Sequence, residues 1–135
     1  MKISAHPITL TQVVADGGVG SVTTTFPIVG EIIEVRGPAG GTTVFASAGT
    51  TDLTITRVND GGTVLAVSNV TPPFQYHPRR AVHTDGGGTT AYSVGGQSVY
   101  DTGAGIPCDG YLKTAWSSAT TIAGSDTIYV YVREA

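Results

Sequence analysis

Apolar side chains recur at every second residue in this sequence, between short stretches rich in glycine. Near the C-terminus, three aliphatic residues within 127–133 alternate with Tyr129, Tyr131 and Arg133. A period of two is that of a β-strand, in which successive side chains point to opposite faces, whereas an α-helix requires a period of 3.6. Because no stretch shows a convincing helical period, the pattern predicts an all-β fold.

Glycine-rich turns divide the chain into about eight strands, at the spacing typical of an antiparallel β-sandwich, and the jelly-roll type fits best. Asp-Gly and Gly-Gly pairs provide the positive φ angles that tight turns need. The clearest hairpin turns at residues 59–62. The expected strands are Ile3–Val14, Val19–Phe26, Gly30–Arg36, Leu53–Val58, Thr63–Val70, Ala91–Tyr100, Tyr111–Ser117 and Thr127–Arg133. Gly95 and Gly96 are expected to break Ala91–Tyr100 in the middle.

Three other segments have weaker patterns. Thr42–Ala46 is compatible with a further short strand, Phe74–Thr84 with an extended segment, and Gly103–Asp109 with a loop. Within the strand Gly30–Arg36, simple alternation puts Ile33 and Val35 on one face and Ile32 and Glu34 on the other.

Length and charge limit the classes of function. With 135 residues, the chain is expected to form one domain, residues 1–135, that holds its own core. Charged residues make up only 13%, against about 25% usually, and the net charge is −3. This balance argues against nucleic-acid binding and against a polybasic membrane anchor. The N-terminus does not read as a signal peptide, no stretch suits a membrane span, and the single cysteine favours a reducing compartment.

The motifs of enzymes and metal sites are missing from the sequence. His77 and His83 lack the two-residue spacing of ligands on one strand face, and the serines lie outside any nucleophile elbow. Four aspartates precede glycine, which suits turn formation. Asp109, next to Cys108, is expected to raise the pKa of the thiol and disfavour thiolate chemistry. We therefore expect no enzyme, no catalytic residues, no cofactor and no metal.

One segment, Phe74–Arg80, groups aromatic, imidazole and guanidinium side chains after two prolines. Arginine and tyrosine are enriched at protein interfaces, so the segment is a candidate contact patch. The alternative is a strand with solvated arginines. Tyr129, Tyr131 and Arg133 form either a second contact or, for the two rings, part of the inner face of the sandwich.

Two stretches in the C-terminal third, Ile106–Lys113 and Gly124–Val132, resemble small structural proteins of tailed phages. Ile8–Leu10 and Gly30–Val35 also resemble that group, most closely the head decoration, or cement, proteins. The resemblance implies a β-sandwich or jelly roll that binds the outside of a capsid, commonly as a trimer, without catalytic residues. Many such proteins have a longer N-terminal arm, and here only Met1–Pro7 is available for that role.

The candidate contact residues are Lys2 and His6 in the N-terminal segment and Tyr76, His77, Arg79 and Arg80 in the central one. The expected function is that of a structural virion protein that binds the major capsid protein on the outer surface of a phage head and stabilises it. It would form a homo-oligomer, with a trimer favoured, and reach the virion after assembly in the host cytoplasm.

The alternative is a carbohydrate- or receptor-binding jelly-roll module of a phage tail or fibre. Such a module needs exposed aromatic platforms, for which Trp116, Tyr76 and Tyr92 are candidates. Trp116 shares a strand face with Leu112, which favours a place in the core.

Overall fold

A computed structural model describes residues 2–38, 43–46, 49–78, 91–94, 97–100, 105–119 and 121–134 of the chain. Two antiparallel sheets dominate it. Sheet A has the strand order β1-β11-β3-β6, with β9 also paired to β3, and sheet B has the order β2-β10-β4-β5. The strands are β1 (Lys2–Gln12), β2 (Val19–Thr23), β3 (Ile28–Arg36), β4 (Thr51–Arg57), β5 (Thr63–Val70), β6 (Gln75–Tyr76), β7 (Ala91–Val94), β8 (Gln97–Tyr100), β9 (Ile106–Gly110), β10 (Leu112–Ser117) and β11 (Gly124–Glu134).

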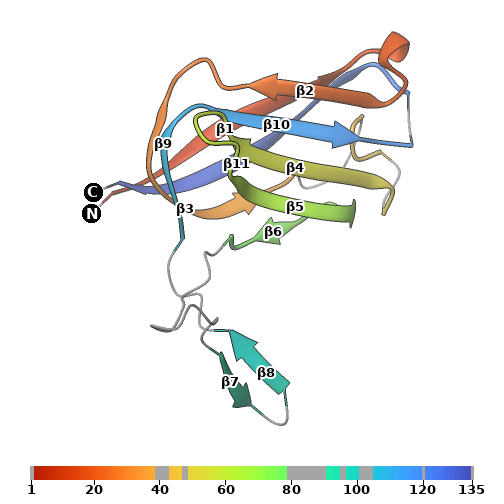
Figure 1. The fold of residues 1–135 in the computed structure, drawn as a ribbon. Coiled ribbons are helices and arrows are strands. Elements are labelled where there is room, and N and C mark those ends of the chain that lie inside the picture. The colour runs from red at the N-terminus through yellow and green to blue at the C-terminus, as the bar shows by residue number, and fades with distance from the viewer. Residues whose placement is uncertain are drawn as a thin grey trace.

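The two sheets lie face to face as the layers of a sandwich (Figure 1). Within the described residues, helical structure is limited to one 3-10 turn, Val14–Asp16, between β1 and β2. The two termini lie side by side, because β1 and β11 pair along their full length from Lys2↔Glu134 to Gln12↔Gly124. The predicted all-β sandwich is confirmed, and so is the predicted hairpin, which is β4–β5.

The inner faces of both sheets supply the core. In β11, Ile128, Val130 and Val132 are buried, which confirms the alternation predicted from sequence. Trp116 of β10 is 3% exposed and lies among these core residues, as its shared face with Leu112 indicated. The other fully buried large side chains include Leu10, Ile28, Ile32, Val35, Val44, Phe45, Leu53, Ile55, Leu112 and Val70.

The expected short strand over Thr42–Ala46 is wrong in its described part, because residues 43–46 form a turn. The backbone N–H groups of Thr43 and Phe45 both donate to Oδ2 of Asp126, at 3.3 and 3.2 Å. Asp126 is 5% exposed on β11. The Asp126 carboxylate therefore accepts hydrogen bonds from backbone N–H groups that, in a strand, would bond to a neighbouring strand. The turn places the side chains of Val44 and Phe45 in the core.

The expected loop over Gly103–Asp109 is also wrong in its described part, because Ile106–Gly110 forms β9, which pairs with β3 from Ile28↔Gly110 to Ile32↔Ile106. The chain leaves sheet A at Gly110, where φ is +146°, and enters sheet B as β10. Of Phe74–Thr84, only Gln75–Tyr76 forms a strand, and residues 79–84 lie outside the described part.

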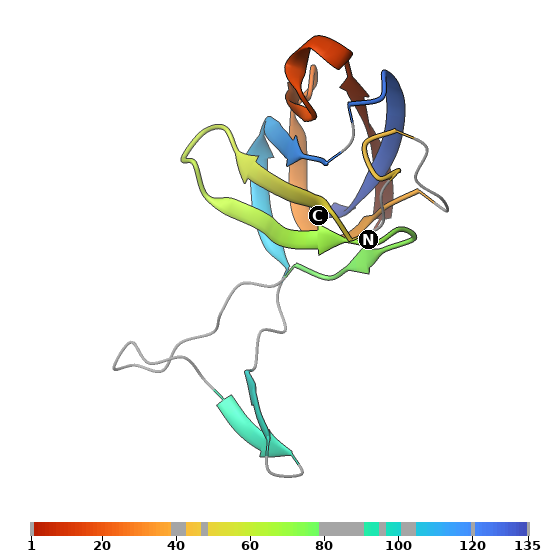
Figure 2. The same cartoon turned by 90° about the vertical axis from the view of Figure 1, so that its right-hand side faces the viewer.

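The segment Ala91–Tyr100, which Gly95 and Gly96 are expected to break, contains two strands, β7 and β8, that pair with each other. They form a two-stranded sheet of their own and lie apart from both larger sheets in the two perpendicular views (Figures 1 and 2).

Candidate contact surface

The outward side chains of sheet A form a continuous surface across four strands, here named the outer A face. Cross-strand partners share a face of a sheet, so the register places these side chains in three rows. The rows are Pro7–Tyr129–Arg36–Gln75, then Ala5–Tyr131–Glu34, and then Ile3–Arg133–Glu31. Tyr129 is 43% exposed and Ile3 57% exposed. Both tyrosines of β11 therefore face outward, which excludes the inner-face alternative for the two rings and leaves the second contact as a prediction.

A β-bulge in β3 brings the acidic residues to this face. The register between β11 and β3 shifts between Tyr131 and Val132: Tyr131 pairs with Glu34 and Val132 with Ile32, which makes Ile33 the extra residue of β3. The predicted assignment of Ile32 to the face of Glu34 is thus wrong, because Ile32 and Val35 are both fully buried. The bulge lets one strand carry Glu31 and Glu34 outward and still bury two aliphatic side chains.

The cations of the outer A face are paired with its carboxylates. Arg36 Nε lies 3.0 Å from Oε2 of Glu34, and Arg133 Nη1 lies 3.7 Å from Oε2 of Glu31. The guanidinium carbon of Arg36 also stands 5.0 Å from the ring centroid of Tyr131, a cation–π distance. Both arginines therefore have a carboxylate oxygen within 4 Å, and neither is an isolated charge.

Glu34 is the centre of the polar cluster at the β3–β6 end of this face. Glu34 is 8% exposed, and its carboxylate accepts a hydrogen bond from the side-chain amide of Gln75. His77 Nε2 lies 3.3 Å from Oε1 of the same carboxylate. Three side chains thus surround one nearly buried carboxylate, which satisfies its acceptors and ties residues 75–77 to β3.

The structure brings few of the sequence-predicted contact residues together. His77 joins the Glu34 cluster, and Lys2 lies 3.9 Å from Glu134 at the end of β1. His6 instead contacts the ring of Phe26, at 5.8 Å between centroids. Tyr76 packs inward on Phe74, at 5.3 Å. Arg79 and Arg80 lie outside the described residues.

Sequence reasoning missed Glu34, Arg36 and Gln75. The spacing of Glu34 and Arg36, two residues apart on one predicted strand, was a usable signal, since residues i and i+2 share a face. The contribution of Gln75 depends on the pairing of β6 with β3, which the local pattern does not reveal.

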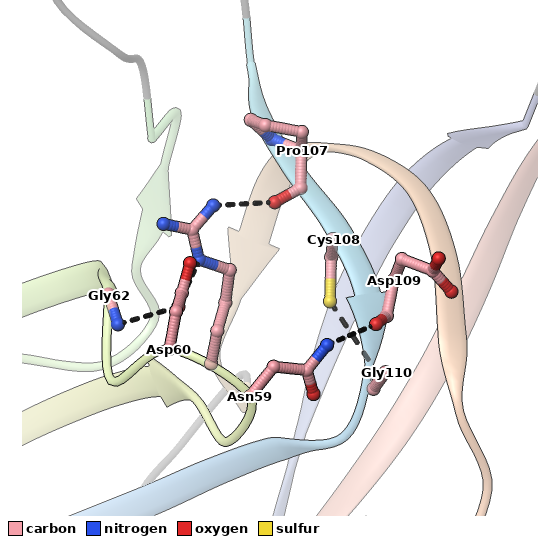
Figure 3. Close-up of polar contacts among 8 residues, drawn as sticks. Asn59, Asp60, Gly62, Pro107, Cys108, Asp109 and Gly110 are labelled. Carbon is pink, nitrogen blue, oxygen red and sulfur yellow. Dashed lines mark hydrogen bonds and ion pairs between the residues drawn. The ribbon is translucent and has the colours of Figure 1, made fainter.

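A second region of interest is a hollow of about 260 Å³ between the β4–β5 turn and β9. Figure 3 shows the polar contacts that join these two segments. Arg57 Nη1 donates to the carbonyl of Pro107 at 2.9 Å, and Asn59 Nδ2 donates to the carbonyl of Asp109 at 2.5 Å. Asp60 lies 3.2 Å from Arg57 Nε and also accepts a bond from the N–H of Gly62. These bonds fasten the hairpin of sheet B to β9 of sheet A.

Cys108 lines the same hollow and is 6% exposed. Burial raises the pKa of its thiol above the ordinary value, the Arg57 guanidinium acts in the opposite direction, and Asp109 adds to the rise. The thiol therefore stays protonated at neutral pH, and the predicted direction of the Asp109 effect agrees. The polar groups here bind one another, so we interpret the hollow as a structural junction.

Across the part of the chain that the structure describes, histidine, cysteine and carboxylate side chains form no cluster of three suited to a metal ion. None of the described helices has the length and apolarity that crossing a membrane requires. Comparison with known proteins gives no match, whether against family models, curated proteins or solved structures.

Proposed function

We propose that this chain is a structural virion protein that binds the outer surface of a phage capsid through its outer A face and stabilises the shell. The observation that carries the proposal is the composition of that face. Two tyrosines, two arginines and the apolar side chains of β1 cover adjacent strands of one sheet. Tyrosine and arginine combine apolar area with directed donors, and they dominate the centres of protein interfaces.

The location of stretches that resemble phage decoration proteins supports the assignment of the contact surface to the outer A face. Gly30–Val35 belongs to β3, Gly124–Val132 to β11 and Ile8–Leu10 to β1, which are neighbours in sheet A. A shell-binding protein also needs a rigid platform, because repeated weak contacts add up only when the geometry is kept at every copy. The full-length pairing of β1 with β11 provides that rigidity.

Substituting Tyr129→Ala tests the proposal. Removing the exposed ring should weaken binding to empty heads, assembled from the major capsid protein of the same genome, by about tenfold or about 1.4 kcal/mol. Co-sedimentation over a concentration series measures the change. The matched control is Tyr111→Ala, because Tyr111 is 41% exposed, nearly as much as Tyr129, but lies at the β9–β10 junction.

Heads carrying the wild-type protein should also melt at a higher temperature than bare heads, and Tyr129→Ala should reduce that gain. If wild-type protein does not sediment with heads, the capsid proposal is wrong. If the Tyr111 variant loses binding and the Tyr129 variant keeps it, the function stands but the assigned face does not.

A further inference from the structure

The outer edge of β1 is the longest unpaired strand edge in the described sheets. β1 spans eleven residues, Lys2–Gln12, and pairs only with β11. A free edge presents backbone N–H and C=O groups that can pair with another strand. Natural proteins protect such an edge with charged side chains or with proline. In β1 the only side chain that is always charged at neutral pH is Lys2, at its end, and Pro7 is the only proline, so most of the edge keeps its backbone N–H groups.

Pro7 shows which residues of β1 direct their backbone groups to the free edge. It lies opposite Tyr129 in an unbroken register, although it has no N–H to donate. In an antiparallel ladder, bonded and non-bonded pairs alternate, so Pro7 occupies a non-bonded position and faces outward. Every second residue of β1 has the same orientation, so the backbone N–H groups of Ala5, Thr9 and Thr11 point to the free edge.

Next to this edge, sheet B ends in β2, so that β1 and β2 together form one side of the sandwich. Residues 7–9 and 22–26 line a groove of about 250 Å³ between them. Residues 3–12 and 19–26 contain no Asp, Glu, Lys or Arg, and His6 is their one titratable side chain. In a two-fold dimer the same surface of both copies meets, so any charge on it would face or approach an identical charge. A surface without charged side chains avoids this repulsion.

The size of this side also fits a dimer. An eleven-residue strand is about 36 Å long, and two sheets about 10 Å apart, with their own thickness, make the side about 20 Å wide. Contact over the whole side would cover up to roughly 700 Å² per copy, close to the roughly 800 Å² per partner of a standard interface.

We propose that two copies of this chain pair antiparallel through the free edges of β1, which joins their A sheets into one continuous sheet. The two-fold axis of such a pair stands perpendicular to the sheet, so both outer A faces point in the same direction. The dimer would present two contact surfaces side by side, an arrangement suited to bivalent binding.

Light scattering after size exclusion tests the proposal on the full chain. The wild type should have twice the 13.8 kDa mass of the chain over a dilution series. Thr9→Pro should weaken dimerisation at least about tenfold, because it removes an outward N–H without removing a bond to β11. Thr127→Lys is the control, since Thr127 pairs with Thr9 but lies on β11, inside the sheet, and should leave the dimer intact.

Circular dichroism checks that each variant keeps its β-structure, and Thr11→Pro repeats the test if Thr9→Pro does not fold. A wild-type monomer, a trimer, or a dimer that both proline variants leave unchanged would overturn the proposal. Binding to heads is a separate measurement, so a monomer that still binds them would disprove the dimer and spare the capsid function.

Discussion

Gly20 shows how a single residue on an edge strand determines the packing of the largest core side chain. It pairs with Trp116 across β2 and β10, and a Cβ atom at this position would overlap three atoms of the indole ring. Gly20→Ala should therefore force the ring to move and lower the free energy of unfolding by about 1–3 kcal/mol, as overpacking does. Chemical denaturation measures the loss.

Ser21→Ala, at the exposed neighbouring position, is the control and should change stability by less than about 0.5 kcal/mol. A double variant with Trp116→Phe supplies the decisive comparison, because the smaller ring lacks the overlapping indole atoms. Its loss should be smaller than the sum of the single losses. Strict additivity would mean that Gly20 does not act through Trp116.

At the scale of elements, Asp126 connects β11 to the turn that fills one part of the core. Asp126→Ala leaves the N–H groups of Thr43 and Phe45 without their acceptor, and burying unpaired donors should cost about 1–3 kcal/mol. Amide hydrogen exchange at Phe45 should accelerate more than exchange in β4. Asp52→Ala is the matched control, since Asp52 also accepts a backbone N–H, from Asn69, but at an exposed site. Equal effects of the two variants would contradict a special role for Asp126.

The same elements show how far the sequence predicts this fold. Alternation identified β4, β5, β10 and β11, because each has one face in the core and one in solvent. It failed for β9, where glycine and proline conceal the alternation of the two buried residues Ile106 and Cys108. It failed again at the β3 bulge and at residues 43–46, because pairing partners distant in sequence decide both.

For the whole molecule, the candidate surface was predictable only in part. Tyr129 and Tyr131 point outward because the aliphatic residues that alternate with them are buried. The alternation was visible in the sequence, and only the choice of which of the two faces is buried was left open. The ion pair between Arg36 and Glu34, by contrast, is seen only in the structure, whereas the sequence alone gives one positive and one negative side chain. Only the assembled sheet shows that the surface is aromatic and internally paired.

This internal pairing determines how binding should respond to salt. Along the described outer A face and the adjoining strand ends, Lys2, Arg36 and Arg133 each lie within 4 Å of a glutamate oxygen. The face therefore offers little net charge to a partner, and long-range attraction should contribute little to affinity. Between about 0.01 M salt, where the Debye length is about 30 Å, and about 1 M, where it is about 3 Å, the Kd for heads should change less than about threefold. A tenfold weakening would instead indicate binding by unpaired cations, and loss of that salt dependence in an Arg79→Ala, Arg80→Ala variant would move the contact to the central segment.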